Sequence, residues 1–398
     1  MARNRVIYQS ESLFVSEDVS STENNKHREL RRIQGANYGF TVNRTDVNQY
    51  GNLSRIDAIA LESPTVNFDM SYYLGDGYNE SALGFDIYGS SQFASGHLEA
   101  SSGRNLFIVT SDEGLDSVGF ESGDAYGLIG IGNSFLSDYS VDLAVGAIPT
   151  VNVSFEASNI MSSNGTVLNY ITGDLPSITT TGGEPIEGSV SIDLPLDSGT
   201  NGPTALRPGD ITLEFPDFDG GESESGTMTK ISGAGSFNIQ NANLSIPLTR
   251  SPLREIGSKF PYARVVDLPA RATLSVNAIL SNMEAGNLVK NIEGCKKKNN
   301  KEIYITANDC EDNEAIRWIL KGATLDSEEW SSNIRTNKSV DLTFGVQLGG
   351  IDDLSRGIFC SGVYNPPVPP VILDTIVYNA LGVEIDSING DIPNLWQY

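Results

Sequence analysis

The stretch Val66-Asn67-Phe68-Asp69-Met70-Ser71 decides the fold class, because apolar and polar side chains alternate along it. A period of two is the signature of a strand with one buried face and one polar face. The stretch Thr273-Leu274-Ser275-Val276-Asn277 repeats the alternation. We therefore expect a strand at 64–74 and an equivalent strand around 273–277.

These two strands belong to a longer internal repeat. Ile33-Gln34-Gly35-Ala36-Asn37 returns as Ile239-Gln240-Asn241-Ala242-Asn243, an offset of 239 − 33 = 206 residues. At this offset Arg44 falls on Arg250, and Gly51 falls on Gly257. Val151–Phe155 resembles Val340–Phe344 at the shorter offset of 340 − 151 = 189. A period this long indicates two copies of one domain of ordinary size.

The composition favours an all-β fold with minor α content. The chain has 398 residues and 40 glycines, and few stretches are typical of long amphipathic helices. Further strands are expected at 5–16, 33–43, 106–110, 150–157, 211–215 and 303–306. We predict a first copy of the domain at 1–160, an acidic linker at 161–205, a second copy at 206–350 and a C-terminal segment at 351–398. The last segment is either an arm against a neighbour or a surface strand that closes the second copy.

Smaller features complete the secondary-structure prediction. Residues 313–320 predict a short helix, because Ile316, Ile319 and Leu320 have helical spacing. Gly127–Gly132 contains only fragments of a nucleotide-binding pattern, and we expect a β-turn or a bulge there. Ser189–Ile192 predicts an ordered strand within the linker, and Pro366–Pro370 predicts an extended polyproline segment.

The net charge of −25 is unevenly distributed. Between Ile56 and Leu206 there are 20 acidic residues and one basic residue, Arg104, which gives 1 − 20 = −19. One interpretation is that the acidity keeps the protein soluble. The other is a surface that must not retain a polyanion. We expect no transmembrane helix and no secretory signal peptide, because the apolar runs are short. Three cysteines favour a reduced, cytosolic setting, although a Cys295–Cys310 disulfide stays open.

No residue pattern predicts catalysis, a cofactor or a metal. The two histidines, His27 and His97, have no neighbouring nucleophile motif, and we expect both at the surface. Asp217–Glu222 lacks the full spacing of a calcium loop, so a solvated loop is favoured. Lys296–Lys298 lacks interleaved aromatic residues, so a solvated hairpin tip or a contact to an acidic neighbour is favoured over nucleic-acid binding.

Three stretches resemble the tail tube (major tail) proteins of long-tailed bacteriophages: Arg32–Phe40, Arg44–Gly51 and Glu62–Asn67. Ser140–Gly146 with Pro149–Phe155 is similar to a later strand pair of that family. The resemblance covers most of 5–160 and, more weakly, 206–350. The linker and the segment after 350 match no pattern of the family.

The resemblance implies a structural, non-enzymatic virion protein. Two tandem β-sandwich tube domains would contribute their inner sheets to a β-barrel shared between subunits. The duplication is similar to the branch that forms stacked homotrimeric rings with pseudo-sixfold symmetry. The implied partners are further copies of the chain and other tail proteins, with DNA passing through the lumen without specific binding and no membrane. Assembly would take place in the host cytoplasm.

The polar face of the alternating strands supplies candidates for the lining of such a channel. They are Asn67, Asp69, Ser71, Thr273, Ser275 and Asn277. DNA carries one negative charge per roughly 1.7 Å of axis, so a neutral or acidic wall would not hold it.

Two other readings stay open. A distal-tail or baseplate-hub ring protein would use the same domains in a different copy number. An adhesin or carbohydrate-binding module would need exposed aromatic clusters or a calcium site. The three tryptophans (Trp318, Trp330 and Trp396) lie in the last quarter without counterparts in the first copy.

Overall fold

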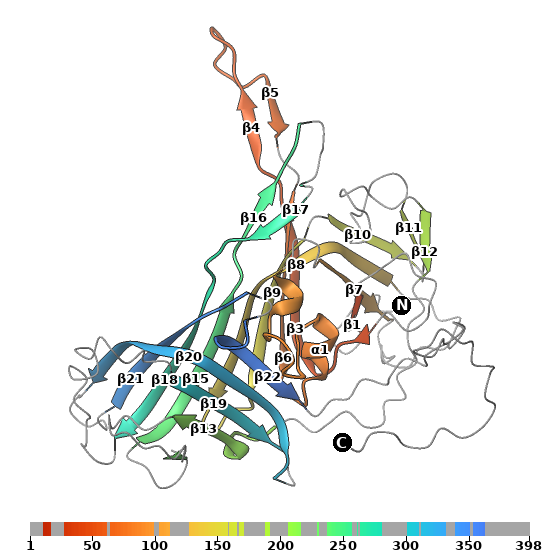
Figure 1. The fold of residues 1–398 in the computed structure, drawn as a ribbon. Coiled ribbons are helices and arrows are strands. Elements are labelled where there is room, and N and C mark those ends of the chain that lie inside the picture. Colours follow the sequence, from red (N-terminus) through yellow and green to blue (C-terminus); the bar gives the residue numbers. More distant parts are fainter. Residues whose placement is uncertain are drawn as a thin grey trace, which may run out of the picture. The chain divides into compact units, whose positions relative to one another are not determined.

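The computed structural model describes 17 segments of the chain (Figure 1). They are residues 11–16, 28–61, 64–98, 103–111, 127–157, 159–164, 167–170, 188–191, 206–215, 229–230, 237–256, 261, 263–280, 301–309, 312–331, 339–350 and 353–362. All of them fall within one compact unit, Met1–Val363. The fold of these segments is all-β, with one short α-helix, α1 (Tyr78–Leu83), and two 3-10 turns, η2 (Ser95–His97) and η3 (Pro208–Asp210). No described helix is long and apolar enough to cross a membrane.

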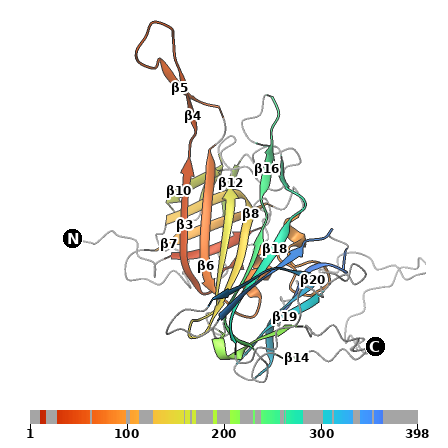
Figure 2. The same cartoon turned by 90° about the vertical axis from the view of Figure 1, so that its left-hand side faces the viewer.

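The first half of the unit contains two sheets that share one strand, β8 (Gly127–Ala144). The early part of β8 pairs with β7 (Arg104–Thr110) and β10 (Asn159–Asn164), and β7 leads on to β1 (Glu11–Ser16) and β2 (Arg28–Glu29). The later part pairs with β9 (Thr150–Ala157), which continues to β6 (Thr65–Tyr73) and β3 (Ile33–Thr41). We call the first group the outer sheet and the second the inner sheet. Figure 2 shows β7 and β10 crossing the direction of β3 and β6.

The register of β8 explains how one strand serves both sheets. A bulge lies between Leu136 and Asp138, just after the section that pairs with β7. A bulge bends a strand and increases its local twist, which allows β8 to leave one sheet and enter the other. The two sheets are therefore continuous through the backbone of β8.

The second half repeats this arrangement. Its outer strands are β13 (Ile211–Phe215), β14 (Thr229–Lys230), β19 (Lys301–Asn308) and β22 (Gly357–Gly362), and its shared strand is β20 (Glu314–Ser331). Its inner strands are β15 (Phe237–Pro247), β18 (Arg271–Leu280) and β21 (Ser339–Gln347). Hairpins β4–β5 (Arg44–Val47, Asp57–Ala60) and β16–β17 (Arg250–Leu253, Ala263–Val266) occupy the same place in the two halves.

The strand registers of the two halves correspond residue by residue. Gly35 faces Ser71 in the first half, and Asn241 faces Asn277 in the second, an offset of 241 − 35 = 206 on both strands. Leu136 faces Phe155, and Leu325 faces Phe344, an offset of 325 − 136 = 189. Leu106, which faces Ile131, corresponds to Ile303, which faces Leu320, an offset of 303 − 106 = 197. The bulges in β3, β8, β15 and β20 fall at equivalent positions.

The two halves join edge to edge, because β8 of the first pairs with β15 of the second. The inner sheet therefore runs continuously in the order β3-β6-β9-β8-β15-β18-β21-β20, a path of eight strands. A second contact joins the halves: Phe93 N donates to Ile358 O at 2.7 Å, and Gly362 N donates to Ile87 O at 2.8 Å. Among the described strands, β3 pairs only with β6, and residues 324–331 of β20 pair only with β21.

The core lies on one face of the inner sheet. Phe68, Phe155 and Phe344 are at most 1% exposed, and the rings of Phe68 and Phe155 lie 6.4 Å apart. Helix α1 packs into the core of the first half through Glu80. The carboxylate of Glu80 accepts hydrogen bonds from Tyr72 Oη at 2.9 Å and Tyr139 Oη at 3.3 Å. Burial raises the pKa of Glu80, and a hydrogen bond from its own backbone and another from the Tyr72 hydroxyl oppose part of that rise.

One secondary-structure prediction was wrong, and another is confirmed only in part. Residues 313–320 form no helix, because 314–331 are a strand in which Ile316, Trp318 and Leu320 are buried at a period of two. The helical spacing of Ile316, Ile319 and Leu320 was coincidental, and neighbours on both sides, β19 and β22, complete the backbone hydrogen bonds. The prediction for Gly127–Gly132 is confirmed in part, because Gly127–Ile131 pairs regularly with β7 and forms no turn, whereas Gly132 and Asn133 form a bulge opposite Asn105.

The other predicted strands are confirmed where the structure describes them. Strands lie at 11–16, 33–41, 65–73, 104–110, 150–157, 211–215 and 301–308, and β12 (Gly188–Ser191) pairs with β11 (Val167–Tyr170) in the linker. Strand β22 lies within the predicted segment 351–398 and pairs with β20. Residues 6–8, His27, Asp217–Glu222, Cys295, Lys296–Lys298, Cys310 and 363–398 lie outside the described residues. The bounds of the four predicted segments stay predictions.

Candidate functional site

The polar face of the inner sheet is the candidate site, and all six predicted lining residues lie on it. Asn67, Asp69 and Ser71 alternate with the buried Val66, Phe68, Met70 and Tyr72. Thr273, Ser275 and Asn277 alternate with the buried Leu274 and Val276 in the same way. Paired residues carry the polar face across the junction of the halves, through Ser71, Asn152, Ser140, Ser245 and Thr273 in order. The structure therefore brings the two predicted triplets onto one continuous surface.

Carboxylates dominate the charge of this face. Alternation places six acidic residues on it: Asp69, Asp138, Asp142, Glu156, Glu329 and Asp341. Arg271 is the only basic residue that the described inner strands place there, and its guanidinium donates to Asp326 at 2.6 Å. Arg264 approaches Glu156 from hairpin β16–β17, with Nη1 3.1 Å from the carboxylate. The face therefore keeps an excess of negative charge after both ion pairs are counted.

Asp142 connects three strands across the junction. Its carboxylate accepts a hydrogen bond from Asn152 Nδ2 of β9 at 2.8 Å and another from Asn243 Nδ2 of β15. In the second half, Asn277 donates in the same cross-strand manner to Asp341. In these pairs the carboxylates accept hydrogen bonds from uncharged amide groups. The amides bring no positive charge, so the face keeps an excess of negative charge.

Arg250 links the two halves by hydrogen bonds to backbone carbonyls of the first half. The side chain is buried, and Nε donates to Leu136 O at 3.2 Å while Nη1 donates to Arg264 O at 3.1 Å. Nη2 donates to His97 O, and the guanidinium carbon lies 5.1 Å from the Phe135 ring centroid. Burial lowers the pKa of Arg250 to about 10, and neighbouring Arg264 adds to the effect, so the group is still charged at neutral pH.

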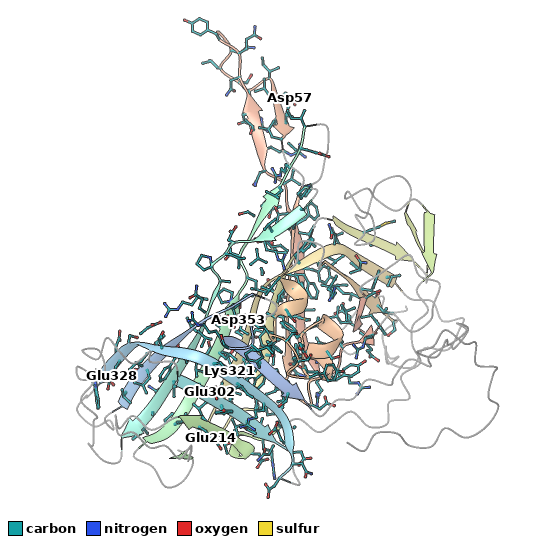
Figure 3. All side chains as sticks on the ribbon, in the orientation of Figure 1. Asp57, Glu214, Glu302, Lys321, Glu328 and Asp353 are labelled. Carbon is teal, nitrogen blue, oxygen red and sulfur yellow. The ribbon has the colours of Figure 1, made fainter. Side chains whose placement is uncertain are left out.

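The hairpins present apolar side chains to solvent. Tyr50 and Leu53 at the tip of β4–β5 and Ile256 beyond β16 are fully exposed. In Figure 1 the β4–β5 hairpin extends away from the inner sheet, and Figure 3 marks Asp57 on it and Glu328 on β20. Exposed apolar residues that share one projecting element are typical of a contact surface.

The expectation that both histidines are at the surface was wrong for His97. Its side chain is fully buried, and its ring lies 4.6 Å from the Phe85 ring in an aromatic cluster with Phe93 and Tyr139. The Gly/Ser-rich sequence around it is typical of a loop, and it gave no sign that η2 would pack under Arg250. The described residues contain no cluster of three or more His, Cys, Asp or Glu that is arranged to hold a metal. Cys360 is a buried free thiol in β22.

The burial of His97 gives stability a specific pH dependence. Desolvation lowers its pKa well below 6.5, and the charges of Arg104 and Arg250 lower it further. The unfolded chain takes up a proton as the pH falls through 6.5, whereas the folded state does not. His97 therefore destabilises the fold by about 1.4 kcal/mol for each pH unit below its unfolded pKa.

We expect His97→Phe to remove this component from the pH profile. The measurement is urea unfolding of the parent chain and the variant between about pH 8 and pH 5, because their difference cancels all other titrating groups. Equal slopes in the two proteins would contradict the assignment to His97.

Comparisons with known proteins identify distant structural similarities only. No family model matches the chain, and no curated protein matches its sequence. Among solved structures, the chain is similar in part to a chain of the anti-feeding prophage baseplate. That match has a TM-score of 0.29 and 12% identity, and it covers 42% of this chain and 99% of the other. It is also similar to a chain of the SPP1 tail tube, with a TM-score of 0.24, 11% identity, and coverage of 40% and 81%. At these values neither similarity assigns a function.

Proposed function

We propose that this chain is a non-enzymatic structural subunit of a phage tail tube. Three copies form a ring with pseudo-sixfold symmetry, and rings stack around a channel through which DNA passes without specific binding. Further copies of the chain and other tail proteins are its partners, and the virion is its location.

The observation that carries this proposal is the edge-to-edge junction of two equivalent halves. Each half contributes four strands to the inner sheet, and β8–β15 shows how one half extends the sheet of the other. The same two kinds of edge, β3 and β20, end the eight-strand path. An exposed edge invites further strand pairing, and closure into a barrel removes it. Three chains supply 3 × 8 = 24 inner strands for such a closed wall.

The charge of the polar face supports its role as a channel lining. With the core on the opposite face, a closed barrel would turn Asp69, Asp142 and their neighbours toward the lumen. DNA repels a wall of this sign, so it is not held during passage. Charges are screened beyond about 10 Å at 0.1 M salt, so residues of the lining itself matter more than the total charge.

The hairpins support stacking of the rings. Tyr50, Leu53 and Ile59 expose apolar surface that a monomer gains nothing by presenting to water. A neighbouring ring would bury this surface, and the hydrophobic gain would act repeatedly along the tube.

Electron microscopy of the concentrated protein and of purified virions tests the proposal. We expect rings of three chains with six similar lobes, stacked rings in the tail, and a copy number among the highest in the virion. A monomer at all concentrations, with no ring in the virion, would refute the proposal. One ring per tail would instead indicate a distal-tail or baseplate-hub protein.

A further inference from the structure

We propose that β3 of one chain pairs antiparallel with β20 of a second copy in a defined register. Thr41 faces Ser327, Tyr38 faces Trp330, and Asn37 faces Ser331. The inference deepens the proposed function, because it rests on chains closing a ring and specifies the joint between them.

The register follows from the junction inside the chain. In that junction, Asn243 of β15 faces Asp142 of β8, and Pro247 faces Asp138. Strand β15 corresponds to β3 at an offset of 206, and β8 corresponds to β20 at an offset of 189. The first pair therefore maps to 243 − 206 = 37 and 142 + 189 = 331, and the second maps to 41 and 327.

The burial of equivalent residues supports the same joint. In β15, Leu244 and Ile246 are at most 1% exposed, because β8 and its half cover them. Their counterparts on the open edge of β3 are Tyr38 and Phe40, which are 38% and 63% exposed.

The β20 edge is exposed in the same way. Val141 of β8 is 1% exposed, whereas its counterpart Trp330 in β20 is 41% exposed. Large apolar side chains thus stand at both open edges, at positions that are buried in the internal junction.

Arg44 is an independent indication. It corresponds to Arg250, because Arg44 faces Ala60 in one hairpin and Arg250 faces Val266 in the other. Arg250 is buried and donates to Leu136 O of the neighbouring half, whereas Arg44 is exposed. In the proposed joint, Arg44 would reach the carbonyl of Leu325 in the second chain, since 136 + 189 = 325.

The side chains at the joint are chemically compatible. Tyr38 and Trp330 would form an aromatic cross-strand pair on the core side. Glu328 replaces Tyr139 of the internal junction and would lie opposite Phe40. Its carboxylate has a hydrogen-bond partner within its own strand, the Trp330 side chain. On the polar side, Asn37 would face Ser331. Both side chains are small and uncharged, so neither a steric clash nor repulsion opposes the pair.

Cysteine pairs test the register directly. In the internal junction, Val145 N donates to Gln240 O at 2.9 Å, and Leu248 N donates to Ser137 O at 2.8 Å. These contacts make Asp142 and Asn243 a non-hydrogen-bonded pair, the type in which side chains approach most closely. The equivalent test variant is Asn37→Cys with Ser331→Cys in the full chain, assembled and then mildly oxidised. We expect a covalent trimer on a non-reducing gel, at least tenfold more abundant than in the control.

Three controls make the result decisive. Asn37→Cys with Glu329→Cys lies on the same face but is shifted by two residues. Asp142→Cys with Asn243→Cys should form the equivalent bond within one chain. The oxidised parent chain reports the background from Cys295, Cys310 and Cys360.

Two outcomes would overturn the inference, and they differ in what they say of the proposed function. Rings seen by microscopy, without cross-linking of the 37–331 pair or with equal cross-linking of the shifted control, would overturn the register alone. A chain that stays monomeric in every variant would overturn both.

Discussion

Replacing Arg250 by alanine should lower the free energy of unfolding of the isolated chain by about 3–5 kcal/mol. The substitution leaves three buried carbonyl oxygens, those of Leu136, Arg264 and His97, without their charged donor. Each buried acceptor left unsatisfied costs about 1–3 kcal/mol, and partial relaxation of the hairpin keeps the total below the sum. Urea unfolding of the monomer at neutral pH measures the loss.

Arg44→Ala is the matched control, because Arg44 holds the equivalent position on an exposed hairpin. We expect its unfolding free energy to stay within about 0.5 kcal/mol of the parent value. In sedimentation at high concentration, the same variant should assemble more weakly than the parent. An Arg250→Ala chain as stable as the parent would show that the guanidinium does not hold the two halves together.

Replacing Phe155 or Phe344 by alanine should lower the free energy of unfolding by a similar, large amount, about 3–5 kcal/mol in either variant. Both side chains are at most 1% exposed, and they occupy equivalent positions, facing Leu136 and Leu325. The loss combines the transfer free energy of an aromatic ring with the cavity that remains. Thermal and urea unfolding of the two variants, compared with the parent chain, provide the measurement.

The shape of these transitions carries further information. Because β8 pairs with β15 and Phe93 bonds to Ile358, we expect both halves to unfold in one transition in either variant. Tyr38→Ala serves as a control. Tyr38 is 38% exposed, so its replacement should lower the free energy of unfolding far less. Two separate unfolding transitions, with only the transition of the substituted half shifted, would contradict this coupling.

The alternating strands and the repeat could be predicted from the sequence because both depend on local pattern. Val66–Ser71 shows a period of two that only a half-buried strand explains, and its repeat at 273–277 has the same period. The change of offset from 206 to 189 was visible, but its cause was not. The strand registers show that the offset falls in two steps, from 206 to 197 before β7 and β19 and from 197 to 189 after them. Insertions of this kind leave no periodic signal.

The junction could not be predicted, because it depends on contacts between distant segments. Arg250 looked like a repeat of Arg44, and nothing local indicated that one is buried and the other exposed. His97 was misplaced for the same reason, since its burial comes from Phe85, Tyr139 and Arg250, which lie elsewhere in the chain. At 313–320 two periodicities competed, and strands β19 and β22 decided between them.

Fusion of the two halves in one chain also restricts how many equivalent halves a closed assembly can contain. Any closed assembly of intact chains contains an even number of equivalent units, so rings of five or seven units are excluded whatever the affinity between chains. In such an assembly every second joint, β8–β15, is formed within a single polypeptide and cannot dissociate into solution. The intervening joints alone respond to concentration, and evolution can alter them without touching their internal counterparts.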